Sequence, residues 1–305
     1  MQTLIEANNL SKKYGNKTVI DNLSFKVNKG EVYAFVGPNG AGKTTVIRLL
    51  SGLAFPTKGE VKLFGEDVNS NPALRQKMGA VVEAPAAFYP YLTGEGNLNL
   101  HAKLAGNVNS ERIAEVLEMM ELSYAKDQKV STYSLGMRQR LGVAAAVLTK
   151  PDILILDEPA SGMDPLSLHL VHSVLQAAAK NGAAVLLSTH HLDEVVTYCS
   201  RVAILEEGKL IDEVNLLDRR QRYRAKVSDP SKAEAVLSNQ DFVRHVKQRG
   251  DEVIFLLSKR EELQNVTAAF FKNNIGLYEL TPDTFNLKAY YREQIHTAAS
   301  QEAKL

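Results

Sequence analysis

The stretch that decides the fold is VYAFVGPNGAGKTT, residues 32–45. Its first five residues form an apolar run that predicts a short strand buried on both faces, and a helix is expected from Thr44 to Ser51. The segment between them fits G-x-x-x-x-G-K-[ST], the pattern of a phosphate-binding loop that follows a strand and opens a helix. The residues expected to contact phosphate are Gly37, Pro38, Asn39, Gly40, Ala41, Gly42, Lys43, Thr44 and Thr45.

The residue types of this loop suit a polyphosphate. Glycines let backbone N–H groups converge on phosphate oxygens, where a Cβ would obstruct the turn or the ligand. Lys43 supplies a positive charge for the β- and γ-phosphates, and Thr44 supplies a hydroxyl ligand for Mg²⁺. The alternative is a glycine-rich turn without a ligand. The strand before the loop and the helix after it favour the phosphate site.

A second run, ILILDE at residues 153–158, predicts a buried strand that ends in two carboxylates. Ligands of open α/β sheets bind at the carboxyl ends of the strands. Asp157 is therefore the expected Mg²⁺ ligand, and Glu158 is the expected base that accepts a proton from the attacking water. The alternative is that both carboxylates only cap a loop before Pro159.

Up to about residue 218 strand-like and helix-like runs alternate, which predicts an α/β domain over residues 1–218. The apolar run at residues 184–187 is typical of a parallel sheet, whereas residues 23–27 and 61–64 alternate like antiparallel strands with one solvated face. From about residue 83 to residue 150 the apolar residues recur at helical spacing. We therefore expect a mixed sheet core, an antiparallel β subdomain and a helical insertion.

A basic, polar run at residues 218–222 predicts a domain boundary. Three strands and two helices are expected beyond it, the strands at residues 222–227, 253–257 and 275–280 and the helices at residues 231–237 and 260–272. An amphipathic stretch at residues 283–296 follows them. Residues 219–305 are therefore predicted to form a small α+β domain.

The bulk composition narrows the possible partners. The 305 residues carry 36 basic and 35 acidic side chains, so no electrostatic case exists for nucleic acid as a partner. A single cysteine, Cys199, cannot form an internal disulfide, which fits a reducing cytosol. The start lacks a basic region followed by an apolar core, and no window approaches ~18–20 apolar residues. We therefore expect neither a secretory leader nor a membrane span.

Further motifs follow in an order that resembles the nucleotide-binding subunit of ATP-binding cassette (ABC) transporters, over about residues 3–214. The most diagnostic is YSLGM at residues 133–137, at the position of the family's Leu-Ser-Gly-Gly-Gln signature. SGMD at residues 161–164 resembles the family's D-loop. The resemblance implies that Tyr14 stacks on adenine, that Ser134 and Gly136 bind the γ-phosphate held by another subunit, that Asp164 lies in the D-loop, and that His190 is the switch histidine that reaches the γ-phosphate.

Three residues depart from the family pattern. Leu135 replaces the first glycine of the signature pair and Met137 replaces its glutamine. Glu83 stands where the family usually has a glutamine that links the Mg²⁺ site to the helical insertion and the membrane partner. As a carboxylate, Glu83 could bind the metal or repel the γ-phosphate, and both alternatives stay open. Together with the C-terminal extension, these features resemble the bacitracin-resistance and sodium-exporter branch of the ABC-2 type.

The resemblance implies an ATPase that uses ATP and Mg²⁺ and powers a membrane transporter, by analogy an exporter of antibiotics, peptides or ions. Two cassettes, identical or paralogous, would sandwich two ATP molecules, with Lys43, Glu158 and His190 acting at the γ-phosphate. The implied partners are the second cassette and an integral membrane permease. The chain would then be cytoplasmic and peripheral on the cytoplasmic face of the membrane.

Two rival functions remain for the phosphate loop. A soluble ABC ATPase that acts on the ribosome or on nucleic acid usually carries two cassettes in one chain, or long coiled-coil or zinc insertions, and this sequence has one cassette and no heptad run. A P-loop kinase would leave the element around Ser134, together with Asp164 and His190, without an explanation.

Overall fold

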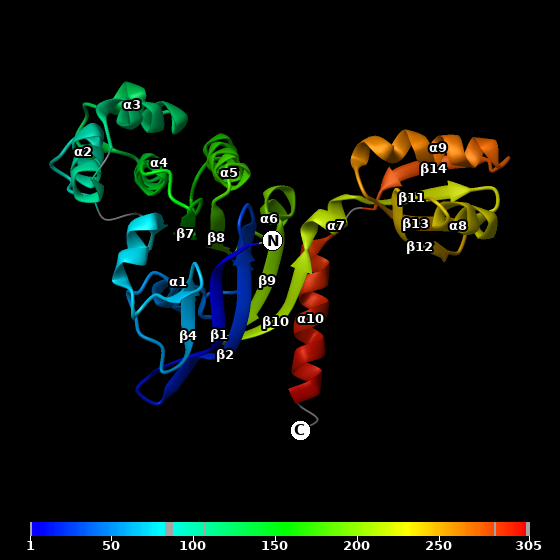
Figure 1. Cartoon of the computed structure of the whole chain (residues 1–305), viewed down its shortest axis with the longest axis horizontal. Helices are drawn as coiled ribbons and strands as arrows, with labels where there is room; N and C mark the ends of the chain where they lie inside the picture. Colours follow the sequence, from blue (N-terminus) through cyan, green and yellow to red (C-terminus); the bar gives the residue numbers. More distant parts are fainter. Residues whose placement is uncertain (1, 83–87, 107, 284, 303–305) are drawn as a thin grey trace. The chain divides into compact units, whose positions relative to one another are not determined.

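The computed structural model describes residues 2–82, 88–106, 108–283 and 285–302, so Glu83 lies outside the described residues. The chain divides into two compact units (Figure 1). The first contains the residues up to Val214 together with those from Tyr290 onward, and the second contains Asn215–Ala289. Each unit buries a hydrophobic core of its own, as independent domains do.

A six-stranded sheet forms the centre of the first unit. Its strands are β3 (Val32–Val36), β6 (Met78–Val81), β7 (Ile153–Asp157), β8 (Ala184–Thr189), β9 (Arg201–Glu206) and β10 (Lys209–Asn215). They lie in the order β10-β9-β3-β8-β7-β6, and the neighbouring pairs from β9 to β6 are parallel. Strands β3, β7 and β8 are buried along their whole length, which explains their unbroken apolar sequences.

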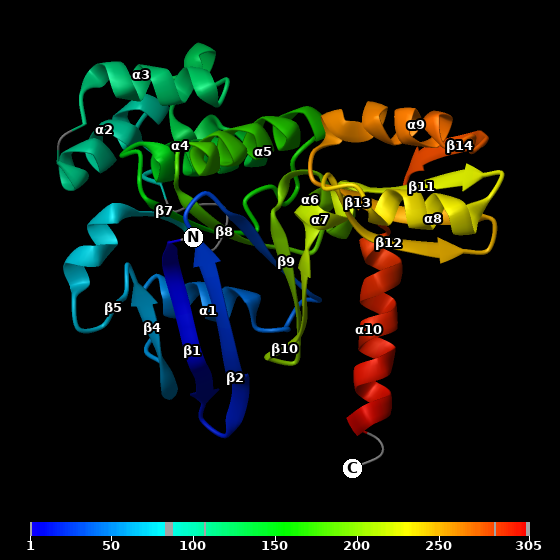
Figure 2. The same ribbon diagram turned by 45° about the vertical axis from the view of Figure 1, so that its right-hand side comes forward.

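A second, antiparallel sheet packs with the first helix of this unit. The sheet contains β1 (Thr3–Tyr14), β2 (Lys17–Asn28), β4 (Lys58–Leu63) and β5 (Glu66–Asp67), and the helix is α1 (Lys43–Leu50). Buried side chains of α1, among them Ile47 and Leu50, share one core with β1, β2 and the inner side chains of β3 and β7. Figure 2 shows β1, β2 and β4 beside α1. This packing fixes the start of α1, and therefore the phosphate loop before it, beside the ends of β3 and β7.

Helices fill most of the remainder of the first unit. The predicted helical insertion contains α2 (Gly94–Ala105), α3 (Ser110–Met119) and α4 (Leu135–Val147), with short 3₁₀ turns at Ser123–Ala125 and Val130–Thr132, and a further 3₁₀ turn at Pro72–Lys77 precedes β6. Helices α5 (Pro165–Lys180) and α6 (Leu192–Tyr198) follow β7 and β8. The mixed sheet, the antiparallel β subdomain and the helical insertion expected from the sequence are thus confirmed. No helix of the described chain has both the length and the hydrophobicity that crossing a bilayer requires.

The second unit is a small α+β domain, as predicted. Its elements are α7 (Leu216–Arg220), β11 (Arg222–Val227), α8 (Pro230–Ser238), β12 (Val243–Arg249), β13 (Glu252–Leu257), a 3₁₀ turn at Arg260–Glu262, α9 (Leu263–Lys272) and β14 (Leu277–Pro282). The sheet order β12-β13-β11-β14 is that of a split β-α-β unit. The sequence did not predict β12. This edge strand carries Arg244, Lys247 and Arg249 and a register shift at His245, so its alternation of apolar residues is broken.

The last helix, α10 (Leu287–Glu302), returns to the first unit. The hydroxyl of Tyr290 donates to Asp212 Oδ2 at 2.5 Å, and the hydroxyl of Tyr291 donates to Glu206 Oε2 at 3.0 Å. The structure therefore groups the residues from Tyr290 onward with the first unit, whereas the sequence placed all of residues 219–305 in the second. The two tyrosine hydroxyls are among the contacts to the first unit, and the spacing of apolar residues carries no sign of them.

Candidate active site

The loop between β3 and α1 wraps around the side chain of Lys43. Its Nζ donates to Gly37 O at 2.7 Å and to Pro38 O at 3.1 Å, and the residue is 6% exposed. The loop runs so close to β9 that a Cβ on Gly37 would lie 2.1 Å from Leu205 O. Gly42 has φ +103 and begins α1 with no side-chain cap from the described residues. The first N–H groups of α1 are therefore available to an anion.

Three side chains from three segments meet beside this loop. Lys43 Nζ lies 3.7 Å from Glu158 Oε1, and His190 Nδ1 lies 2.8 Å from Glu158 Oε2. Glu158 follows β7 and His190 follows β8, and these parallel neighbours end at the same edge of the sheet. The structure thus brings together the three residues that the sequence assigned to γ-phosphate chemistry. A carboxylate beside the phosphate loop can accept a proton from a water bound near the phosphates.

The backbone of Glu158 is held by Ser188, a residue to which the sequence pattern assigns no role. Glu158 has φ +46, a conformation that is uncommon and strained outside glycine. Ser188 Oγ accepts the Glu158 N–H at 3.0 Å and donates to Asp157 Oδ1 at 2.5 Å, and Ser188 is fully buried. Asp157 pairs with Ser188 in the β7–β8 register, and this pairing is the signal that could have identified the role of Ser188.

Asp157 and Thr44 have the donor groups that Mg²⁺ prefers. Asp157 is 4% exposed at the end of β7, and Thr44 stands in the first turn of α1, which packs on β7. Mg²⁺ commonly takes one or two protein oxygens and completes its shell with water and phosphate. This pair fits such a site. The described residues contain no group of three or more His, Cys, Asp or Glu side chains able to hold a metal without the phosphates, and Glu83 lies outside them.

A cavity of about 490 Å³ adjoins the outer side of the phosphate loop. It is lined by Lys17–Val19 of β2, by Pro38–Ala41, and by Glu206 and Glu207. Tyr14 is not among these lining residues, but it pairs with Lys17 in the β1–β2 register. Tyr14 is 46% exposed, and Lys12 Nζ lies 4.7 Å from the centroid of its ring. An exposed ring at this place has a free face on which a base can stack.

The signature element stands at the start of α4. Ser134 caps this helix, because its Oγ accepts the Met137 N–H at 3.2 Å. A Cβ on Gly136 would meet no atom within 4 Å, so the backbone is open to an incoming group at this position. Neither Ser134 nor Gly136 has a hydrogen bond to the phosphate loop within the described ranges. The structure therefore does not join them to Lys43 within one chain.

The loop from Glu158 to Asp164 connects β7 to α5. Asp164 caps α5 by accepting the N–H groups of Leu166 and Ser167, both at 3.0 Å, and the Ser167 hydroxyl at 2.6 Å. These hydrogen bonds, foremost that from the Ser167 hydroxyl, lower the pKa of the Asp164 carboxyl. Leu135, the departure in the signature, is 42% exposed, and its Cδ2 lies 3.2 Å from where a Cβ on Gly162 would be.

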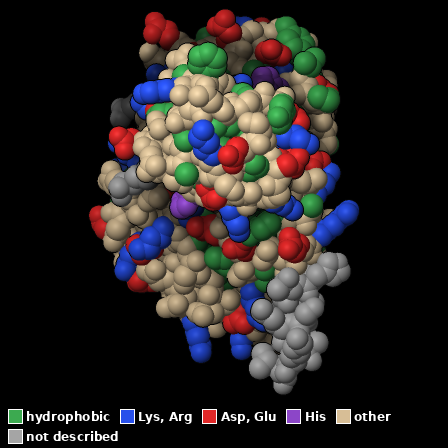
Figure 3. Space-filling model, turned by 90° about the vertical axis from the view of Figure 1, so that its right-hand side faces the viewer, with side chains coloured by type: hydrophobic (Ala, Val, Ile, Leu, Met, Phe, Trp, Pro, Cys, Tyr) green, Lys and Arg blue, Asp and Glu red, His purple; other side chains and the backbone are tan. Residues whose placement is uncertain are grey.

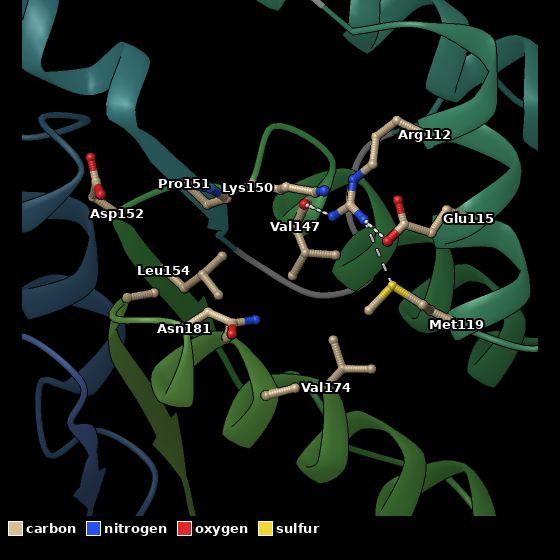
Figure 4. A pocket seen from close by; sticks show the side chains of 13 residues that line it. Arg112, Glu115, Met119, Val147, Lys150, Pro151, Asp152, Leu154, Val174 and Asn181 are labelled. Carbon is tan, nitrogen blue, oxygen red and sulfur yellow. Dashed lines mark hydrogen bonds and ion pairs between the residues drawn. The ribbon is translucent and has the colours of Figure 1, made fainter.

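A second cavity, of about 390 Å³, lies at the opposite end of β7 (Figure 4). Arg112 of α3 reaches across it to the last turn of α4. Its Nη2 donates to Val147 O at 2.6 Å and its Nε donates to Leu148 O at 3.0 Å, and Nη1 pairs with Glu115 at 2.8 Å. This cavity contains none of the predicted site residues. Arg112 therefore stabilises the end of α4 that is remote from Ser134.

Known proteins match this chain along nearly its whole length. Residues 20–161 match the ABC transporter family. The ABC transporter ATP-binding protein YhcH of Bacillus subtilis is 39% identical over 299 residues, which cover 96% of each chain. The bacitracin transport ATP-binding protein BcrA of Enterococcus faecalis is 35% identical over 301 residues, which cover 97% of each chain.

Solved structures agree with the sequence relatives. The structure of an ATP-binding subunit of an ABC transporter has a TM-score of 0.66 and 32% identity, and the match covers 71% of this chain and 92% of that one. The dimeric ATP-binding cassette MJ0796 with ADP and Pi has a TM-score of 0.65 and 25% identity, over 70% of this chain and 99% of that one. The chain is therefore a member of the ABC transporter ATP-binding protein family, the ATPases whose ATP hydrolysis powers transport.

Proposed function

We propose that each active site of this ATPase is completed by a second cassette. The observation that carries this proposal is the division of the site: Lys43, Glu158 and His190 meet at one sheet edge, whereas Ser134 and Gly136 stand apart from them on α4. An open helix N-terminus beside Gly136 suits the γ-phosphate of an ATP bound by the partner. The related cassette MJ0796 forms dimers, which supports the same arrangement here.

Within each site the residues have separate tasks. The phosphate loop and Lys43 hold the β- and γ-phosphates, and the exposed ring of Tyr14 stacks on the base. Glu158 accepts the proton of the attacking water, and His190 orients Glu158 through the 2.8 Å contact. Thr44 and Asp157 would hold Mg²⁺, which neutralises charge on the phosphates. Ser134 and Gly136 of the second cassette would then enclose the γ-phosphate.

The proposed work of the dimer is to drive export through a membrane permease. BcrA is named for bacitracin transport, and the ATP-binding proteins LnrL and DrrA, 36% and 39% identical over 68% of this chain, are named for linearmycin and for daunorubicin and doxorubicin resistance. An antibiotic or peptide is therefore the proposed class of cargo. The chain would act on the cytoplasmic face of the membrane, docked on the permease. Whether the second cassette is identical or paralogous does not change the geometry of the site.

The soluble alternative, an ATPase acting on the ribosome or on nucleic acid, receives no support. The relatives named above are transporter subunits. On the face shown in Figure 3, acidic and basic side chains are interspersed, and the chain's formal net charge is +1. A nucleic-acid partner requires a basic surface instead.

The central test replaces Glu158 by Gln, which keeps the shape of the side chain but cannot accept the proton. Glu158→Gln is expected to bind ATP, to hydrolyse it about 10²–10⁴-fold more slowly, and to accumulate as a dimer in light scattering with ATP and Mg²⁺. Glu118→Gln, on the exposed side of α3, is the matched control and should behave like the parent chain. A Glu158→Gln chain that still hydrolyses ATP at the parental rate would contradict the assignment of the base.

A second test addresses the transporter. The chain, expressed with the membrane protein encoded beside it, is purified from detergent-solubilised membranes. Co-purification of a polytopic permease is expected, together with stimulation of the ATPase rate when both are placed in lipid vesicles. If the chain instead co-sediments with ribosomes and is absent from the membrane fraction, the transport proposal is wrong.

A further inference from the structure

The first turns of α4 contact the loop that carries Glu158. Gln139, in the second turn of α4, donates from Nε2 to the carbonyl oxygen of Ser161, and this side chain is 4% exposed. Leu135, one turn earlier, lies against Gly162. The element that holds Ser134 and Gly136 and the loop at residues 158–164 are thus joined at two neighbouring points inside one chain.

Gln139 is an unusual choice for a buried position on a helix. Its Oε1 is buried and has no hydrogen-bond partner in the described part of the chain. A buried amide with an unsatisfied oxygen lowers stability, and an apolar side chain of the same length would fill the space without that cost. The use of glutamine here is therefore explained by what its N–H group does, which is to hold the Ser161 carbonyl.

The held carbonyl belongs to a loop whose course determines the position of Glu158. The Ser161 N–H donates to Glu158 O at 3.1 Å, so the loop turns back on the residue that we assign as the base. Ser188 fixes one end of the loop through the Glu158 N–H, and Asp164 fixes the other end by capping α5. Gln139 holds the middle. A movement of the start of α4 therefore shifts Ser161 and, through the hydrogen bond from the Ser161 N–H, the carbonyl of Glu158, whereas the Glu158 N–H stays bonded to Ser188.

We propose that Gln139 is a positioning residue that couples the signature end of α4 to Glu158 of the same chain. The inference rests on the proposed function, in which Ser134 and Gly136 contact ATP bound by the partner. ATP held by one chain then sets α4 of the other chain, and through Gln139 it sets that other chain's Glu158. Each ATP thereby prepares hydrolysis at the opposite site, so the rate of hydrolysis at one site of the dimer depends on ATP bound at the other. Leu135, packed on Gly162, adds a second contact to the same connection.

The test uses Gln139→Met, which keeps the length of the side chain and removes the donor. Differently tagged chains are assembled with ATP into two mixed dimers that each have one working base. In the first, a Gln139→Met chain is paired with a Glu158→Gln chain, so the working Glu158 and the altered Gln139 are in the same chain. In the second, a chain with both substitutions is paired with the parent chain, so they are in different chains. A single turnover is measured, because a dimer with one inactive site need not reopen.

The proposal expects the first dimer to hydrolyse about 10- to 100-fold more slowly than a parent/Glu158→Gln dimer, because a base displaced by an ångström loses about that much, and the second to keep its rate. The opposite result, loss in the second dimer alone, would mean that Gln139 acts on the partner's ATP, and it overturns the proposal. Equal loss in both with a lowered melting temperature, or no loss in either, overturns it as well. Gln128→Met, at an exposed site, is the control substitution.

The proposed function is checked separately with Ser134→Arg in the same two pairings. If the sites are shared between chains, Ser134→Arg abolishes turnover when the working Glu158 is in the other chain, whereas with both in the same chain turnover slows by no more than the roughly 10- to 100-fold expected for Gln139→Met. If that pattern is absent, the two-chain site is wrong, whatever Gln139 does. If it is present and the Gln139→Met dimers do not differ, the two-chain site stands and the coupling through Gln139 is wrong.

Discussion

Replacing Ser188 by Ala removes two hydrogen bonds at the centre of the active site. Ser188 is fully buried, accepts the N–H of Glu158 at 3.0 Å, and donates to the nearly buried carboxylate of Asp157 at 2.5 Å. A hydrogen bond to a charged group contributes about 1.5–3 kcal/mol and a neutral one about 0.5–1.5 kcal/mol. Ser188→Ala is therefore expected to lower the free energy of unfolding by about 2–4.5 kcal/mol.

The same substitution affects catalysis through the backbone. With φ +46, Glu158 occupies a strained conformation, and the hydrogen bond to Ser188 is one of the contacts that maintain it. Loss of this contact lets the carboxylate move, and a displacement of about 1 Å lowers the rate by about 10²-fold. Binding of ATP through the phosphate loop should change little, because Ser188 makes no hydrogen bond to residues 37–44 in the described structure.

The assay combines urea unfolding, followed by circular dichroism, with steady-state ATPase rates and equilibrium binding of a fluorescent ATP analogue. Ser173→Ala is the matched control, since Ser173 is exposed on α5 and its hydroxyl donates to the carbonyl of His169. It should cost less than about 0.5 kcal/mol. The reasoning is refuted if Ser188→Ala unfolds at the same urea concentration as the parent chain and retains its kcat.

Three further substitutions test other parts of the structure. Arg112→Ala removes two hydrogen bonds to the end of α4 and should lower the free energy of unfolding by about 1–3 kcal/mol. In urea unfolding, Arg112→Lys should have a stability between those of the parent chain and Arg112→Ala. Equal stability of all three chains would count against this prediction. Burial lowers the pKa of His172 to about 4. The neutral ring therefore contributes stability above pH ~6.5, and this contribution is lost as the pH falls toward 4. His172→Leu should reduce the decline of the melting temperature over this pH range. Burial and Glu206 raise the pKa of Tyr291 to about 12. The contribution of this tyrosine to the stability of the fold is therefore complete below pH ~10 and is lost as the pH rises through 12. Tyr291→Phe should remove this dependence of the melting temperature on alkaline pH.

Much of the first unit could be predicted because its signals are local. The apolar run before Gly37 and the run before Asp157 each describe a strand buried on both faces, and the structure places both in the parallel sheet. Parallel neighbours end at one edge, so the meeting of Glu158 and His190 follows from their positions after two such strands. These features need no information beyond the order of residues and the geometry of sheets.

The features that the sequence did not predict depend on contacts between distant residues. Ser188 follows an apolar run and Gln139 stands between two arginines, and their roles appear only when β8 lies beside β7 and α4 beside the 158–164 loop. Strand β12 lacks the alternation of apolar and polar residues that predicts a strand, because its charged residues protect a sheet edge. In α10 the hydroxyls of Tyr290 and Tyr291 bond to carboxylates of the first unit, and amphipathic spacing does not reveal such bonds.

The left-handed backbone at Glu158 means that the residue needed for ATP turnover is not the residue that would stabilise the fold most. Glycine or asparagine would adopt φ +46 with less strain, so either should make the fold more tolerant of other mutations while removing the carboxylate. Valine, isoleucine or threonine would add steric conflict to the loss of the base. In a library that samples every amino acid at this codon, the variants that survive heating best and the variants that turn over ATP should form separate groups. Selection for ATP turnover thus retains a residue that selection for stability alone would discard.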